Sequence, residues 1–68
     1  MSNINLSVNV KRYRKEKSFT QQDLAIKANL PLSIIAKIEQ GFSSQPTIQT
    51  VVKLAQALEV SLDELVLE

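Results

Sequence analysis

A chain of 68 residues, 44% of them apolar, is long enough for one small domain, and no stretch reaches the roughly 18 apolar residues of a membrane span. It has no Cys, no His and a single Gly, which excludes disulfides, zinc–thiolate sites, thiol or imidazole catalysis and glycine-rich phosphate loops. With a net charge of +1 and no signal-peptide layout, we expect one cytoplasmic domain over residues 1–68 that is not an enzyme and takes no metal, cofactor or membrane partner.

The first predicted helix follows from the spacing of three apolar residues. Leu6, Val10 and Tyr13 recur at i, i+4 and i+7, which is one face of an α-helix. This spacing predicts an amphipathic helix that ends near Ser18. We expect residues 1–5, which precede the pattern, to form a flexible N-terminal arm.

A short second helix is marked at both ends. Thr20 and, three residues later, Asp23 resemble a capping box, with Asp in place of the usual Glu or Gln. The predicted buried face consists of Leu24, Ala25 and Ala28. Asn29 suits a left-handed turn at the end of this helix, because Asn tolerates a positive φ better than most residues.

The third predicted helix begins near Pro31 or Leu32 and ends at Gly41, with Ile35 and Ile38 as its inward pair. By subtraction, its outward face consists of Leu32, Ser33, Ala36, Lys37 and Gln40. Apolar residues are unexpected in the first turn of an exposed helix. Leu32 and Ile34 therefore need an explanation.

Two more helices follow a loop rich in Ser, Gln and Pro. Thr47 can cap a fourth helix, whose apolar residues are Ile48, Val51, Val52, Leu54, Ala55 and Leu58. Ser61 and Glu64 form a capping box for a last helix that carries Leu62, Leu65 and Val66. Capping and the helix dipole also explain the acidic residues of this last helix, so they need no metal. We therefore expect an all-α fold of five short helices.

Charge divides the chain into a basic and an acidic part. Up to Gly41, seven Lys and Arg stand against three acids, a net +4; from Phe42 onward, one Lys stands against four acids, a net −3. Such a division either turns one basic face toward a polyanion or reflects ordinary solvated helix surfaces.

Two short helices joined by a tight turn, TQQDLAIKANLPLSIIAKIEQG, have the pattern of a helix-turn-helix. From about Leu6 to Leu65, the chain resembles the Cro/CI-type helix-turn-helix family, also called the XRE family. The resemblance rests on RYRKEKSFTQQDLA, on IEQG and on PTIQTVVKLAQALEVSLDEL, with matching helix lengths and order. It implies a compact five-helix, lambda-repressor-like domain. It also implies a sequence-specific transcriptional regulator, a repressor, that binds a palindromic double-stranded DNA operator as a homodimer.

The resemblance also implies roles for individual residues. The recognition helix, about residues 32–40, would enter the major groove, and the N-termini of the second and fourth helices would hold phosphates. The implied DNA-contacting residues are Thr20, Gln21, Gln22, Leu32, Ser33, Ala36, Lys37, Gln40, Ser43, Ser44, Gln45 and Thr47. Capping alone is the alternative role for Thr20 and Thr47. Arg14 and Glu39 occupy the positions of an inter-helix ion pair, unless Arg14 is only a surface charge.

Three departures from the family pattern bear on stability and binding. Pro31 stands where the family prefers a capping Ser or Thr, although proline fits a first helical turn. Glu59 replaces the Gly usual after the fourth helix, which costs about 1 kcal/mol if its φ is positive. The outward face of the third helix has neither Arg nor Asn, and no Gln before Gln40. Specificity is therefore either modest or carried partly by water and DNA shape.

Two surfaces leave alternatives open. Leu32 and Ile34 either contact thymine methyl groups and sugar edges or serve a regulatory protein partner, as in a protein-interaction module. The last helix ends in consecutive apolar residues that cannot all face one core. We expect them to form a homodimer interface through Leu62, Leu65 and Val66, and the alternative is a frayed or trimmed end.

Overall fold

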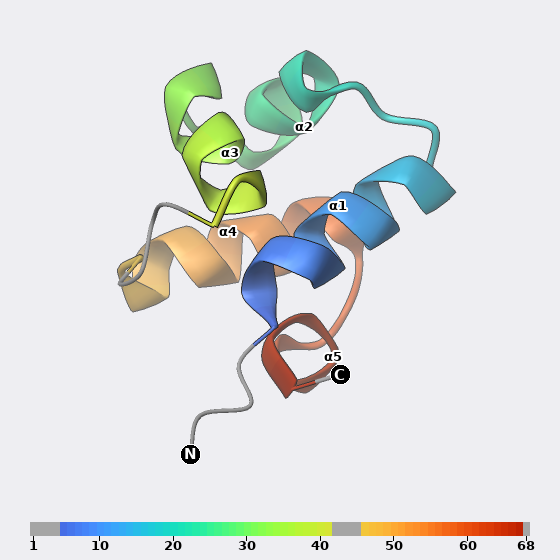
Figure 1. Ribbon diagram of the computed structural model, residues 1–68, viewed down its shortest axis with the longest axis vertical. Coiled ribbons are helices and arrows are strands. Elements are labelled where there is room, and N and C mark those ends of the chain that lie inside the picture. Colours follow the sequence, from blue (N-terminus) through green and yellow to red (C-terminus); the bar gives the residue numbers. More distant parts are fainter. Residues whose placement is uncertain (1–4, 42–45, 68) are drawn as a thin grey trace.

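Five α-helices make up the computed structural model of the chain, which describes residues 5–41 and 46–67 (Figure 1). The helices are α1 (Leu6–Glu16), α2 (Gln21–Ala28), α3 (Leu32–Glu39), α4 (Ile48–Leu58) and α5 (Leu62–Leu67). No strand occurs in these two ranges, so the predicted all-α fold of five short helices is confirmed. None of the helices described has the length and apolar character of a membrane span.

Side-chain caps fix where α2 and α5 begin. Thr20 Oγ1 accepts a hydrogen bond from the Asp23 N–H at 3.0 Å, and the Asp23 carboxylate accepts one from the Thr20 N–H at 2.9 Å. Ser61 and Glu64 exchange the same two hydrogen bonds, at 3.0 and 2.9 Å. Both predicted capping boxes are confirmed. Each satisfies main-chain N–H groups that have no partner within the helix, and so gives the helix a defined start.

A residue with a positive φ follows each of the first four helices, and after α3 it is Gly41, with a φ of 79°. Asn29 follows α2 with a φ of 57°, as predicted, and Glu59 follows α4 with a φ of 60°. Ser18 also has a φ of 60°, which the sequence pattern did not indicate. The positive φ of Glu59 means that the expected penalty for replacing the usual Gly applies here.

One hydrophobic core is shared by all five helices. α1 packs against α3, α4 and α5, and α2 packs against α3 and α4. The buried apolar residues are Leu6, Val10, Leu24, Ala25, Ala28, Ile35, Ile38, Val51, Leu54, Ala55, Leu58 and Leu65. This set contains the inward faces predicted for the second and third helices. Ile48 is the main apolar residue of α4 that stays outside the core, with an exposed fraction of 70%.

A buried asparagine ties the beginning of the fold to its end. Asn9 is 2% exposed, and its Nδ2 donates to the Leu65 carbonyl at 2.9 Å and to the Glu64 carbonyl at 3.4 Å. The Asn5 N–H donates to the Val66 carbonyl at 3.0 Å. Asn5 was expected in the flexible arm, but it is anchored, because it supplies a donor to a carbonyl that α5 cannot satisfy itself. The rest of the arm, residues 1–4, lies outside the described residues.

Candidate nucleic-acid interface

α2, α3 and the turn between them form a helix-turn-helix at one side of the molecule (Figure 1). The turn is closed by the Leu30 N–H, which donates to the Ala25 carbonyl at 2.9 Å. Pro31 precedes α3 with an extended backbone and offers no side-chain cap. The Ile34 and Ile35 N–H groups donate instead to the Pro31 carbonyl, so α3 starts at Leu32 as predicted.

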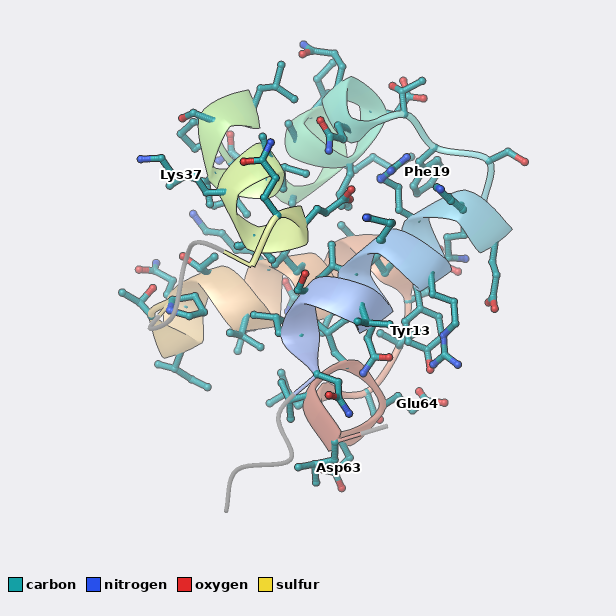
Figure 2. All side chains as sticks on the ribbon, viewed as in Figure 1. Tyr13, Phe19, Lys37, Asp63 and Glu64 are labelled. Atoms are coloured by element: carbon teal, nitrogen blue, oxygen red, sulfur yellow. The ribbon has the colours of Figure 1, made fainter. Side chains whose placement is uncertain are left out.

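The outward face of α3 is the surface predicted to contact base edges. Ser33, Lys37 and Gln40 are exposed, and Ala36 is half-buried. Leu32 is 44% exposed at the N-terminal end. Figure 2 shows the Lys37 side chain extending away from the body of the molecule. The structure thus gathers the expected residues of α3 on one accessible surface.

Ile34 differs from the expectation that it would share the exposed surface of Leu32. Its side chain is half-buried and packs against the core. On an eight-residue helix, the core covers more than the arc of Ile35 and Ile38, and Ile34 lies only one position away from that arc. The apolar surface beside Leu32 is instead supplied by α2, because Ile26 is 67% exposed.

An open groove of about 520 Å³ runs along this apolar surface. It is lined by Gln22, Ala25, Ile26, Asn29, Leu30, Pro31 and Leu32. Its lining comes from α2, from the turn and from Leu32, the first residue of α3. Sequence reasoning missed Ile26, although its position two residues after buried Leu24 already places it outside the inward face of α2.

The predicted ion pair of Arg14 and Glu39 is present and has two hydrogen bonds. Arg14 Nε lies 2.6 Å from Glu39 Oε2, and Arg14 Nη2 lies 3.0 Å from Oε1. The two side chains are 12% and 2% exposed. Arg14 Nη1 also donates to the Phe19 carbonyl at 2.8 Å. Arg14 is therefore no ordinary surface charge: it joins α1, the turn before α2 and the C-terminal end of α3.

The Glu39 carboxylate stays ionised in this setting. Burial alone would raise the pKa of Glu39, but hydrogen bonds from Arg14 and Gln21, with the positive charges of Arg14 and Lys11, hold the pKa below its ordinary value. The hydrogen bond to Glu39 correspondingly raises the pKa of Arg14. The carboxylate is thus a fixed negative charge at the C-terminal end of α3.

Gln21 is half-buried, and its amide is directed at the protein. Its Nε2 donates to Glu39 Oε1 at 3.0 Å. The first main-chain N–H groups of α2 have no partner within the helix, and the capping box takes only that of Asp23. For a phosphate contact at this helix end, the main chain of Gln21 and of exposed Gln22 therefore offers donors that do not compete with Glu39.

The second expected phosphate anchor is described only in part. Ser43, Ser44 and Gln45 lie outside the described residues. Thr47 is exposed, and its Oγ1 accepts a hydrogen bond from the Thr50 N–H at 3.1 Å. Its capping role is thereby confirmed, as it is for Thr20. Both residues are exposed, and the Thr47 hydroxyl also lies 3.0 Å from the Thr50 hydroxyl.

The last helix presents a different apolar surface from the expected one. Leu62 is 40% exposed, and Val66 is half-buried. Leu65 is fully buried, because α5 packs its side chain into the chain's own core. It therefore offers no surface to a second copy. The other exposed apolar residue of α5 is Leu67, with an exposed fraction of 57%.

Sequence reasoning also missed how α1 holds the end of α3. Ser7 Oγ donates to the Glu39 carbonyl at 2.9 Å, which satisfies one of the last main-chain acceptors of α3. Ser7 and Arg14 are seven residues apart, a spacing that puts them on one face of a helix. That spacing was a signal in the sequence, but its partner on α3 could not be identified without the fold.

A family model described as helix-turn-helix matches residues 10–65. The transcriptional regulator SinR of Bacillus licheniformis is 37% identical over 59 residues, which cover 87% of this chain and 53% of SinR. The regulator SlrR of Bacillus subtilis (strain 168) is 36% identical over 56 residues, covering 82% of this chain and 37% of SlrR. The chain thus spans about half the length of these curated relatives, or less.

Solved structures agree with this assignment. The biofilm regulator SinR in complex with DNA has a TM-score of 0.85 and 35% identity, covering 88% of this chain and 95% of that one. The restriction-modification controller C.AhdI of Aeromonas hydrophila has a TM-score of 0.83 and 27% identity, covering 88% and 89%. SinR was also solved in a complex with the protein SinI, at a TM-score of 0.85 and 35% identity, covering 88% and 58%. The chain belongs to the Cro/CI-type (XRE) helix-turn-helix family.

Proposed function

We propose that this chain is a sequence-specific DNA-binding regulator of transcription, a repressor that inserts α3 into the major groove. The proposal rests on the accessible outward face of α3, whose C-terminal end is held in place by α1. Ser33, Lys37 and Gln40 are exposed, while the ion pair of Arg14 and Glu39 fixes the C-terminal end of the helix. SinR, whose structure is similar to that of this chain, was solved in complex with DNA, which supports DNA as the ligand.

The chemistry of this face fits base edges, with limited direct discrimination. Lys37 can donate to guanine O6 or N7 or to a phosphate, and Ser33 can hydrogen-bond to either kind of acceptor. Leu32 and Ala36 can pack against thymine methyl groups. Without Arg or Asn on this face, DNA shape and water carry part of the specificity. We expect Leu32→Ala to relax the preference at one base pair.

The protein acts as a homodimer in this proposal. The exposed apolar residues Leu62 and Leu67 of α5 support a contact between two copies. Such a contact would set two recognition helices about 34 Å apart, the spacing of successive major grooves, and match a palindromic operator. This role requires binding and no catalysis, and the chain has no Cys or His that could act as a nucleophile or a base. The proposed location of the protein is the cytoplasm.

A regulatory protein partner is a second proposed ligand. The groove supports it, because the exposed apolar side chains of Ile26 and Leu32 both line it and exposed apolar residues favour a protein contact. Such a partner would bind next to the recognition helix and compete with DNA.

Selection of duplexes from a randomised DNA pool tests the proposed function. The binding of the winners is then measured at about 50 and 200 mM salt, since release of counterions makes phosphate-dominated binding fall steeply with salt. We expect a palindromic winner with a steep loss of affinity. No enrichment, or binding that is indifferent to sequence and salt, would overturn DNA recognition and favour the protein partner.

A further inference from the structure

One face of α1 packs against α3, and Figure 1 shows the two helices as neighbours. Ser7 and Arg14 mark this face, since Ser7 Oγ donates to the Glu39 carbonyl at 2.9 Å and Arg14 pairs with the Glu39 carboxylate. Lys11 lies between them, four residues after Ser7 and three before Arg14. This spacing puts all three side chains on the same side of the helix.

Lys11 is exposed at the edge of this contact. Its position, one turn after Ser7 and one turn before Arg14, places it beside the C-terminal end of α3, because both of those residues contact Glu39. Gln21 Nε2 donates to the Glu39 carboxylate from the first turn of α2. The side of α1 that carries Lys11 therefore adjoins both parts of the proposed interface through Arg14, Glu39 and Gln21.

Most neighbouring cations of this basic part of the chain already have a partner. Arg14 pairs with Glu39, and Lys17 Nζ lies 3.4 Å from Glu59 Oε1. Arg12 lies over the Tyr13 ring at 4.7 Å, and Lys27 lies over the Phe19 ring at 5.4 Å. Among residues 5–41 and 46–67, the ion pairs are those of Arg14 with Glu39 and of Lys17 with Glu59, so Lys11 pairs with no carboxylate there.

We propose that Lys11 binds a phosphate of the DNA backbone beside the C-terminal end of α3. This inference rests on the proposed function, and it adds a clamp from α1 to those of α2 and α4. An exposed ammonium group on a long, flexible side chain suits a point contact with phosphate. A contact on this side of α3 complements the N-terminal end of α2 and fixes the angle at which α3 enters the groove.

Fluorescence anisotropy with a selected duplex, measured over a series of salt concentrations, tests the inference. Log affinity falls as log salt rises, and the loss of one phosphate contact makes this slope shallower by about 0.9. We expect Lys11→Ala to show this change, with about eightfold weaker binding near 0.1 M salt and a smaller difference at higher salt. Lys11→Arg should restore the slope, because it keeps the positive charge.

Arg12→Ala is the matched control. It removes the same charge from the next position of α1, about 100° around the helix. Figure 2 shows Tyr13, the ring under Arg12, on the opposite side of the molecule from Lys37. We expect its salt slope to equal that of the unsubstituted chain.

The outcomes separate this inference from the proposed function. If Lys11→Ala keeps the original slope of log affinity against log salt, the phosphate contact is overturned while DNA binding stands. The same holds if the substitution lowers only the stability of the fold and leaves that slope unchanged. An equal loss of slope in Arg12→Ala would also overturn it, since the effect would then be one of overall charge. If the unsubstituted chain binds no duplex, the proposed function itself fails.

Discussion

Replacing Glu39 tests whether the buried ion pair holds the helix-turn-helix together. Glu39→Leu removes the acceptor of three hydrogen bonds, two from Arg14 and one from Gln21. It also leaves Arg14, whose side chain is 12% exposed, without its counterion. Breaking one side of such a pair costs about 3–5 kcal/mol, mainly because the remaining charge stays away from water.

The expected loss is large for a domain of this size. At about 0.05–0.15 kcal/mol per residue, 68 residues give a free energy of unfolding of about 3–10 kcal/mol. A loss of about 3 kcal/mol would therefore leave a weakly folded or unfolded chain. The double variant Arg14→Met with Glu39→Leu should recover part of the loss, because it leaves no unpaired buried charge.

Urea unfolding followed by far-UV circular dichroism measures these differences in a double-mutant cycle. We expect the losses of unfolding free energy in Arg14→Met and Glu39→Leu, added together, to exceed the loss in the double variant by at least about 2 kcal/mol. Single losses below about 1 kcal/mol that simply add would refute the reasoning, since they are typical of an exposed ion pair.

Four further predictions concern pH, backbone strain, the α1–α5 contact and DNA. Because the pKa of Glu39 is lowered in the folded chain, the ionised carboxylate stabilises the fold fully above the ordinary value of about 4.5, and this stabilisation is lost as the pH falls through the lowered pKa. Measured at decreasing pH, the free energies of unfolding of the unsubstituted chain and of Glu39→Leu should therefore approach each other. Glu59→Gly relieves the strain of a φ of 60° and loses only an exposed ion pair, so the free energy of unfolding should rise by about 0.5–1 kcal/mol. Glu59→Ala keeps the strained backbone and should give no gain. Asn9→Ala leaves buried carbonyls of α5 without a donor, and chemical denaturation should show a loss of about 1–3 kcal/mol; a change near zero would mean that the hydrogen bond to Leu65 contributes nothing. Lys37→Ala should weaken binding of a selected duplex several-fold with a shallower salt dependence, and unchanged affinity would show that α3 presents another face to DNA.

The features that the sequence predicts well are local ones. Thr20 with Asp23, and Ser61 with Glu64, need only residues three positions apart to form a capping box, and both boxes form. Apolar spacing likewise identifies all five helices, since each has to bury one face. The ion pair of Arg14 and Glu39 is a long-range contact that sequence alone does not reveal, and it was predictable only through the resemblance to a family.

The features that the sequence does not reveal depend on how helices meet. Ile34 and Leu65 were placed on exposed surfaces, but in helices of eight and six residues a shift of one position moves a side chain into the core. In the sequence, Asn9 resembles any polar residue of an amphipathic helix, and only the fold brings it to the Leu65 carbonyl of α5. Ser7 similarly acquires a role only where α1 meets the last carbonyls of α3.

The most direct test of the account follows the main-chain amide signals of the isotope-labelled chain by NMR during titration with a selected duplex. The account predicts that the largest changes fall on α3, around Ser33 and Lys37, and on the first turn of α2, with saturation as the duplex is bound. Changes centred on the groove at Ile26, or on α5 alone, would contradict the claim that α3 carries DNA recognition.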